Sequence, residues 1–324
     1  VYYEGDCSHV DGCDMLVYTV AIPPDNPEYT AAKAAGIPCI SRADYLGYLM
    51  SGYGCRIGVS GMHGKSTTTS MLEKLFSDAG RDPTVSCGAR MVSQNSAHRI
   101  GGEEYFIFEA CEYMDSFLDF YPTIAIILNI EMDHVDYFHS MEQIHTSFHK
   151  FLERTEPDGI ALVNCADDDV MRAAAGYEGR LVTFGVEEPD ADYCADSITF
   201  EKGCARFTIR HHGDILCTAA LQVPGAHAVC DALAAAAAAH LCGISGEEIA
   251  RALEKFQGLG RRMEPCGKAK CGAAVYSDYA HHPTEIAASL TAAEQMGFRR
   301  IFCVFQPHTY SRTSRLFDDF AAAL

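Results

Sequence analysis

The stretch Gly61-Met-His-Gly-Lys-Ser66 decides the fold, because it lies between two segments of different periodicity. Arg56–Ser60 before it is a short run typical of a buried strand, and 66–79 has the pattern of an amphipathic helix. In such a strand–turn–helix unit, backbone N–H groups of the loop and of the helix N-terminus bind phosphate groups. Lys65 can then reach the β- and γ-phosphates of a nucleotide, and the Ser66 hydroxyl can bind Mg²⁺.

The glycines of this loop are needed where the backbone approaches phosphate oxygens, because a β-carbon would keep them apart. The spacing is shorter than the usual G-x-x-x-x-G-K-[ST], since residue 59 is Val. An ordinary strand–helix turn that contains Gly-Lys-Ser by chance is the alternative. The run Ser66–Thr69 after the loop favours a phosphate site.

The rest of the chain repeats the unit of a short strand, a turn and a helix, which predicts an α/β fold. We expect three Rossmann-like α/β segments, over residues 1–53, 54–258 and 259–324. The apolar runs 105–110 and 123–130 indicate a central parallel sheet covered on both faces. Alternating short strands over 192–223 predict an antiparallel annex to that sheet. The other expected strands are 15–20, 37–40, 160–164, 181–186, 273–277 and 301–305, and the other expected helices are 26–35, 43–50, 141–154, 227–241, 246–256, 283–296 and 314–323.

Charge and composition exclude several classes of function. The chain has 324 residues and a formal net charge of −19. Nucleic-acid binding needs a basic face, so we expect no nucleic-acid partner. No uncharged apolar run is long enough to predict a membrane span. The 15 cysteines form no C-x-x-C pair, and we expect a reducing cytoplasm as the location.

The order of motifs along the chain resembles that of the Mur ligases, which build the peptide stem of bacterial cell-wall precursors. The residues Gly61–Thr69 resemble the ATP loop of this family, and the resemblance extends over essentially the whole chain. The His-His-Pro-Thr-Glu and Phe-Gln-Pro-His segments are similar to those of the branch that adds L-alanine. The motifs that carry the resemblance are 21–28, 61–69, 109–112, 129–137, 260–262, 278–285 and 305–308.

The resemblance implies sites for ATP and Mg²⁺. Ser66, Glu109 and His134 match metal ligands of the family, and both Glu109 and His134 follow strand ends, where parallel sheets bind ligands. Without the resemblance, Glu109 would be interpreted as a solvated strand end and His134 as a loop histidine. Lys65 and Arg262 match catalytic cations of the family, although Arg262 alone could be a surface charge. The implied nucleotide-binding residues are Gly61, Met62, His63, Gly64, Lys65, Ser66, Thr67, His227, Asp231, Arg262 and Asp278.

This chain departs from the family pattern in the nucleotide region. Relatives have two asparagines where this chain has Ala228 and Asp231. A carboxylate at 231 can accept from the adenine amino group, but it cannot donate to a ring nitrogen. Ala228 and Asp231 therefore stand at the two positions where the resemblance implies contact with the adenine base.

The third segment is expected to bind the incoming amino acid. By resemblance, Tyr279, His281, His308 and Arg312 are substrate-binding residues, and His281 is also counted as catalytic. A helix N-cap region is the other interpretation of His281 and His282. Thr309 stands where relatives have an arginine, and Arg315 is a candidate to replace it.

The activity that the resemblance implies is joining of L-alanine to the carboxylate of UDP-N-acetylmuramate through an acyl phosphate, in peptidoglycan precursor synthesis. Cations positioned on the developing negative charge would stabilise each step. The alternatives are another Mur or folylpolyglutamate-type ligase, or an ATP-binding protein without ligase activity.

No Gly-x-Gly-x-x-Gly pattern occurs in residues 1–52, and the third segment has two expected strands. We therefore expect the chain to be clipped at both ends, to bind ATP weakly at best, and not to form the amide by itself.

Overall fold

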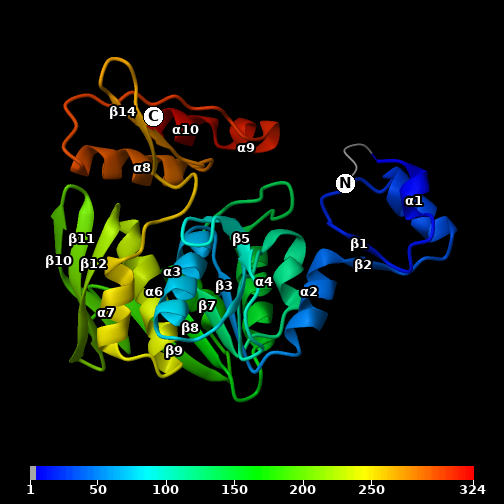
Figure 1. Ribbon diagram of the computed structural model, residues 1–324, viewed down its shortest axis with the longest axis horizontal. Helices are drawn as coiled ribbons and strands as arrows, with labels where there is room; N and C mark the ends of the chain where they lie inside the picture. Colours follow the sequence, from blue (N-terminus) through cyan, green and yellow to red (C-terminus); the bar gives the residue numbers. More distant parts are fainter. Residues whose placement is uncertain (1–4) are drawn as a thin grey trace.

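The computed structural model describes residues 5–324, and three parts follow one another along the chain. The N-terminal part lies beside a large central sheet, and the third part lies over one end of that sheet (Figure 1). Within residues 5–324, no helix is long and apolar enough to cross a membrane.

The N-terminal part is a small parallel pair of strands with its helices. The short 3₁₀ helix η1 (Cys7–Val10) comes first. β1 (Leu16–Tyr18) pairs with β2 (Cys39–Ser41), and α1 (Pro27–Ala34) connects these two strands. The Asn26 side chain caps α1 by accepting from Glu28 and Tyr29 N–H, as an N-cap asparagine does. α2 (Arg42–Met50) leads to the central part, and its Gly47 lies so close to the Asp119 carbonyl that a β-carbon would not fit.

The central part is one sheet of ten strands in the order β12-β11-β10-β9-β8-β7-β3-β6-β4-β5. β3, β4, β6, β7, β8 and β9 pair in parallel, β10 continues from β9 in parallel, and β10, β11 and β12 are antiparallel to one another. The predicted antiparallel annex is therefore confirmed, as an extension of the same sheet. The strands are β3 (Cys55–Ser60), β4 (Thr84–Met91), β5 (Ser96–Arg99), β6 (Tyr105–Glu109), β7 (Ile124–Ile127), β8 (Ile160–Asn164), β9 (Arg180–Val186), β10 (Tyr193–Glu201), β11 (Cys204–His211) and β12 (Asp214–Pro224).

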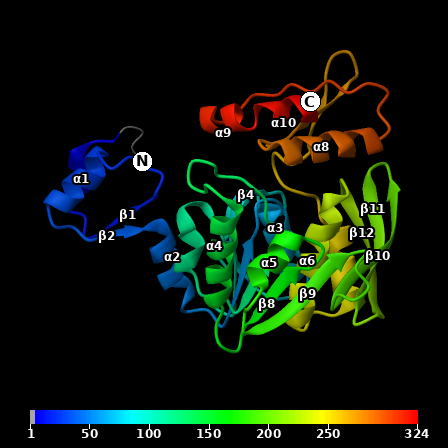
Figure 2. The same cartoon turned by 180° about the vertical axis from the view of Figure 1, so that it is seen from behind.

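Helices cover both faces of this sheet and enclose two apolar cores. α3 (Lys65–Asp78), α6 (His227–Leu241) and α7 (Gly246–Glu254) lie on one face (Figure 1), and α4 (Met141–Glu153) and α5 (Asp168–Ala174) lie on the other (Figure 2). The run Ala232–Ala239 of α6 is buried against the first core. The 3₁₀ segment η2 (Tyr113–Asp119) packs with α4 in the second core, where the Phe117 and Phe151 rings stack.

The third part is small and differs from the prediction in two strands, since β13 was not predicted and the strand expected over 301–305 is absent. β13 (Glu264–Lys268) pairs with β14 (Ala274–Ser277), and α8 (Pro283–Gln295) follows. Ile301–Phe305, predicted as a strand, is not one: Phe302 and Val304 are 83% and 97% exposed. A strand needs a neighbour for its backbone hydrogen bonds, and among residues 5–324 none lies beside this run. The helix expected over 314–323 is divided into α9 (Tyr310–Arg315) and α10 (Phe317–Ala323).

Candidate active site

The predicted phosphate loop lies between β3 and α3, as its sequence pattern indicates. Gly61 and Gly64 have φ values of 133° and 84°, which residues with a β-carbon rarely adopt. Asn129, just after β7, holds the loop from the side. Its Oδ1 accepts from His63 N–H at 2.8 Å and its Nδ2 donates to the His63 carbonyl at 3.0 Å. The loop is therefore fixed by the neighbouring strand end before any ligand binds.

Lys65 extends over the loop toward a buried carboxylate. Its Nζ donates to the Met62 carbonyl at 3.2 Å and lies 3.0 Å from Oε2 of Glu112. Burial opposes the ammonium charge, but Glu112, Cys111 and Glu109 together outweigh burial and raise the pKa of Lys65. The loop therefore places a charged ammonium group within reach of bound phosphate oxygens.

Glu112, which was not predicted as a site residue, lies beside His134. Its side chain is fully buried, and Oε1 lies 3.0 Å from His134 Nε2. Burial would raise the pKa of Glu112, but Lys65 and His134 lower it. Glu109 instead accepts from Gly88 N–H at 2.5 Å and from the Cys87 thiol at 3.2 Å. Glu112 follows the last residue of β6 by three positions, in the motif Glu109-Ala-Cys-Glu112. It could have been found as the next carboxylate after the strand end.

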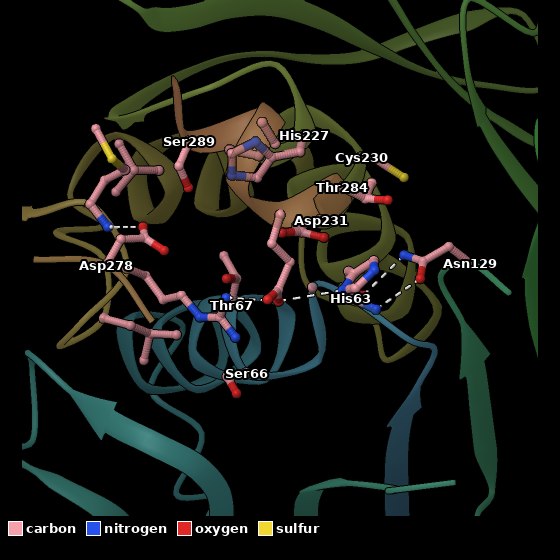
Figure 3. A pocket seen from close by; sticks show the side chains of 18 of the residues that line it. His63, Ser66, Thr67, Asn129, His227, Cys230, Asp231, Asp278, Thr284 and Ser289 are labelled. Carbon is pink, nitrogen blue, oxygen red and sulfur yellow. Dashed lines mark hydrogen bonds and ion pairs between the residues drawn. The ribbon is translucent and has the colours of Figure 1, made fainter. Parts of the chain in front are cut away.

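Two cavities meet at the phosphate loop. The first, of about 460 Å³, is lined by His63, Ser66 and Thr67 below and by α6 above, including His227 and Asp231 (Figure 3). The second, of about 480 Å³, lies on the other side of the loop. Residues that line the second cavity include Met62, Lys65, Glu109, His134, Tyr279 and His281. His63, Gly64, Ser66, Arg262 and Glu285 line both cavities.

Asp231 is the most unusual group of the first cavity. Its carboxylate contacts Gly64 so closely that a β-carbon at 64 would not fit. Burial raises the pKa of Asp231 to about 7, although Arg262 and His63 oppose this shift. His227, one turn earlier on α6, lines the same cavity, and burial lowers its pKa. The departure noted in the sequence is therefore a titratable group beside the phosphate loop.

Glu285, at the start of α8, connects the third part to the loop. Arg262 donates to Glu285 at 3.0 Å, and the His281 N–H donates to it at 2.9 Å. The His63 ring lies between Glu285, at 3.4 Å, and Glu131. Burial would raise the pKa of Glu285, but the facing His281, His63 and Arg262 lower it strongly. Glu131 and Glu285 lie in motifs that carry the family resemblance, but no role was predicted for either residue.

Glu131 is a second link from the central part to the third. It accepts from the Thr284 hydroxyl at 3.0 Å and lies 3.3 Å from His282 Nδ1. His282 is the N-cap residue of α8, as one of its two interpretations predicted.

The remaining predicted residues divide into two groups. Tyr279, His281 and His308 lie together: the His281 and His308 ring centroids are 5.3 Å apart, and the Tyr279 hydroxyl is 3.4 Å from His308 Nε2. Arg312 is elsewhere, buried against Asp133, whose Oδ1 accepts from it at 2.7 Å. Arg315 donates to the Val135 carbonyl at 2.7 Å.

Asp278 lines the first cavity and accepts from Met263 N–H at 2.8 Å. Substrate roles for Arg312 and for its neighbour Arg315 stay predictions.

Known protein families match this chain in three consecutive regions. Residues 2–53 match the model described as "Mur ligase family, catalytic domain", 59–239 the "Mur ligase middle domain", and 261–324 the "Mur ligase, glutamate ligase domain". The chain belongs to the Mur ligase family.

Curated Mur ligases are similar over nearly the whole chain. A UDP-N-acetylmuramate–L-alanine ligase of Caldanaerobacter subterraneus is 45% identical over 314 residues, which are 96% of this chain and 68% of the relative. One of Agathobacter rectalis is 43% identical over 100% of this chain and 70% of its own. Among solved structures, the UDP-N-acetylmuramate–alanine ligase of Thermotoga maritima has a TM-score of 0.82 at 27% identity, covering 97% of this chain and 70% of that one. The resemblance to the Mur ligases is thereby confirmed.

Proposed function

We infer that this chain is an ATP-dependent ligase that joins L-alanine to the carboxylate of UDP-N-acetylmuramate, in peptidoglycan precursor synthesis. The relatives named for that reaction, at 42–45% identity over 96–100% of the chain, support this activity. The observation that carries it is the pair of cavities that meet at the phosphate loop. A nucleotide in the first cavity would direct its terminal phosphate toward the second, where a carboxylate and an amine would meet.

The position of each group of residues in the site indicates its role. Loop N–H groups and Lys65 would bind and orient the phosphates of ATP, whose γ-phosphoryl group activates the substrate carboxylate. Arg262, which lines both cavities, would stabilise negative charge at the point of transfer. Tyr279, His281 and His308 from the third part would orient the incoming amino acid. Closure of the third part would exclude water from the activated carboxylate.

Ser66, Glu109 and His134 line the second cavity together, and Glu112 faces His134 from the buried side, so this region offers donors suited to Mg²⁺. A hydroxyl, a carboxylate and an imidazole are oxygen and nitrogen donors, and the buried Glu112 keeps its charge. We propose Glu112 as the carboxylate ligand that faces His134, and Glu109 lines the second cavity together with His134. When bound, the metal would neutralise charge on the phosphate oxygens. Both nucleotide substrates favour the cytoplasm as the place of the reaction.

The experiment that tests this function is ATP-dependent phosphate release by the intact protein. Release should require UDP-N-acetylmuramate and L-alanine together, and mass spectrometry should detect the amide product. D-alanine and glycine, each in place of L-alanine, test whether the second cavity selects this amino acid.

An ATP-binding protein without ligase activity is the second candidate, favoured by the buried carboxyl of Asp231 beside the loop. ATP binding without phosphate release under any substrate combination would establish that alternative.

A further inference from the structure

A pair of thiols lies at the end of the sheet remote from the phosphate loop. Cys55 is the first residue of β3, and Cys242 is the C-cap residue of α6. They are 187 residues apart in sequence, yet their Sγ atoms are 3.9 Å apart. Both are partly exposed, so a small molecule can reach them. Formation of a disulfide requires the sulfurs to approach from 3.9 Å to about 2.05 Å.

The surroundings of Cys55 favour its thiolate form. The contact with Cys242 has the largest effect, and the Thr123 hydroxyl donates to Cys55 Sγ at 3.4 Å. Together with the nearby Arg56, they lower the pKa of Cys55 to about 7, against the opposing effects of burial and Glu104. The contact with Cys55 raises the pKa of Cys242. One sulfur is therefore prepared as a nucleophile and the other as its hydrogen-bond donor.

The other thiols show that this environment is specific. Cys87 is buried next to Glu109, and both burial and that carboxylate raise its pKa. Burial likewise raises the pKa of Cys111 to about 11. Wherever a thiol pKa is shifted among residues 5–324, Cys55 excepted, it is raised.

We propose that Cys55 and Cys242 are an oxidisable pair that forms a disulfide on reaction with a hydroperoxide. The Cys55 thiolate attacks one oxygen of hydrogen peroxide, an S–O bond forms, the O–O bond breaks, and the hydroxide that leaves takes a proton to become water. The Cys242 sulfur then attacks Cys55 Sγ, an S–S bond forms, and the S–O bond breaks with loss of a second water. In sum, two thiols and one peroxide give one disulfide and two waters, and a dithiol reductant reverses the change.

The position of the pair determines what the disulfide does. β3 runs from Cys55 directly into the phosphate loop, and α6 runs from His227 and Asp231 to Cys242. The bond would therefore join the far ends of the two elements that form the nucleotide site. Because it closes a long chain loop, it restricts the unfolded state and stabilises the central sheet. The reacting groups themselves lie at the other end of both elements.

Peptide mapping tests this proposal without using the ligase activity. The reduced protein is treated with one equivalent of hydrogen peroxide, its free thiols are alkylated, and it is digested with trypsin and a protease that cleaves before aspartate. Peptides 44–56 and 231–251 then contain Cys55 and Cys242 as their single cysteines. We expect mass spectrometry to find these two peptides linked as the main disulfide. The oxidised protein should also unfold at a higher temperature than the reduced protein.

Matched variants separate the pair from general cysteine oxidation. In Cys242→Ser the linked peptide should disappear, and dimedone should trap a sulfenic acid on peptide 44–56. In Cys303→Ser, which removes an exposed thiol of the third part, the linkage should remain. Absence of the linked peptide in the unaltered protein would overturn the proposal. So would equal linkage of Cys55 to several other cysteines, or no change in unfolding temperature on oxidation.

Discussion

Residues 55–256 are held together by two apolar cores, whereas 261–324 meet them largely through ion pairs and hydrogen bonds. Within 261–324, the buried apolar side chains are Pro283, Ile286, Ala292 and Phe320. The contacts of this part with the loop region include Arg312 with Asp133, Glu285 with His63, and Thr284 with Glu131. Apolar packing fixes the central sheet in one arrangement. Charged contacts can instead be exchanged for the charges of a ligand, which suits a part that opens to release product.

The largest effect expected is that of Lys65→Ala in the intact protein. Removal of the loop cation should lower ATP turnover by at least about 100-fold, because charge developing at the phosphates loses its nearest stabilising group. Lys74→Ala is the matched control, since Lys74 lies on the same helix and pairs with Asp78 far from the loop. Near-normal turnover in Lys65→Ala would remove this loop from the mechanism.

The next prediction compares Glu109 and Glu112, the two carboxylates of one motif. Glu112→Gln and His134→Ala should each raise the Mg²⁺ concentration needed for half-maximal activity roughly 10- to 100-fold, because each removes a proposed ligand. Glu109→Gln should have a smaller effect, since Glu109 bonds to Gly88 and Cys87. Titration of all three variants with Mg²⁺ checks this order. A larger shift for Glu109→Gln would return the ligand role to Glu109.

A smaller effect is expected at Asp231. Its pKa is raised from 3.8 to about 7, so the carboxyl stays protonated below about pH 7 and becomes a carboxylate above it. That charge repels phosphate, so ATP affinity should fall as the pH rises through 7. In Asp231→Asn the affinity at pH 8 should be higher by roughly 10-fold, which corresponds to one pKa unit. Calorimetry at pH 6 and pH 8 measures the difference, and equal affinities in both proteins at both pH values would place Asp231 outside the pocket.

The raised pKa of Asp231 also predicts that the stability of the protein depends on pH. A raised pKa means that the folded protein holds this proton more tightly than the unfolded chain. The contribution of Asp231 to stability is therefore complete below about pH 4 and is lost as the pH rises to about 7. Asp231→Asn should be more stable than the unaltered protein at pH 8, by a margin that shrinks toward pH 4 in thermal unfolding. A constant difference between the two proteins would contradict the raised pKa.

The sequence predicted the elements whose pattern is local. The phosphate loop, α3 and the apolar strands β6 and β7 follow from periodicity and glycine positions, and their bounds agree with the structure to within a few residues. β4, β5, β13 and α5 were missed. In Thr84–Met91 the apolar residues alternate with Ser86, Gly88 and Arg90, and the other three elements are short and have no continuous apolar run. The run 301–305 has the composition of a strand, but strand formation depends on a partner that composition does not reveal.

The candidate site was predicted less completely than the fold. The loop pattern indicated Lys65, and the family resemblance indicated Glu109, His134 and Arg262; all four line the second cavity. Their catalytic and metal-binding roles stay predictions. The role of Glu109 as a metal ligand stays a prediction, and Glu109 lines the second cavity with His134. Glu112 was not predicted, because the direction of a side chain after a strand end depends on tertiary contacts. The roles of Glu285 and Glu131 also depend on contacts between segments more than 60 residues apart in sequence, which one sequence does not display.

Hydrogen exchange in Glu285→Gln tests the contrast between the two regions most directly. The substitution keeps the shape of Glu285 and removes the charge that faces Arg262, His63 and His281. Amides of β14 and α8 should exchange several-fold faster than in the unaltered protein, while those of β6 and β7 keep their protection. Glu294→Gln, an exposed change on the same helix, should alter neither region. Unchanged exchange in 264–295, or equal acceleration in both regions, would contradict the account that charge holds the third part on the phosphate loop.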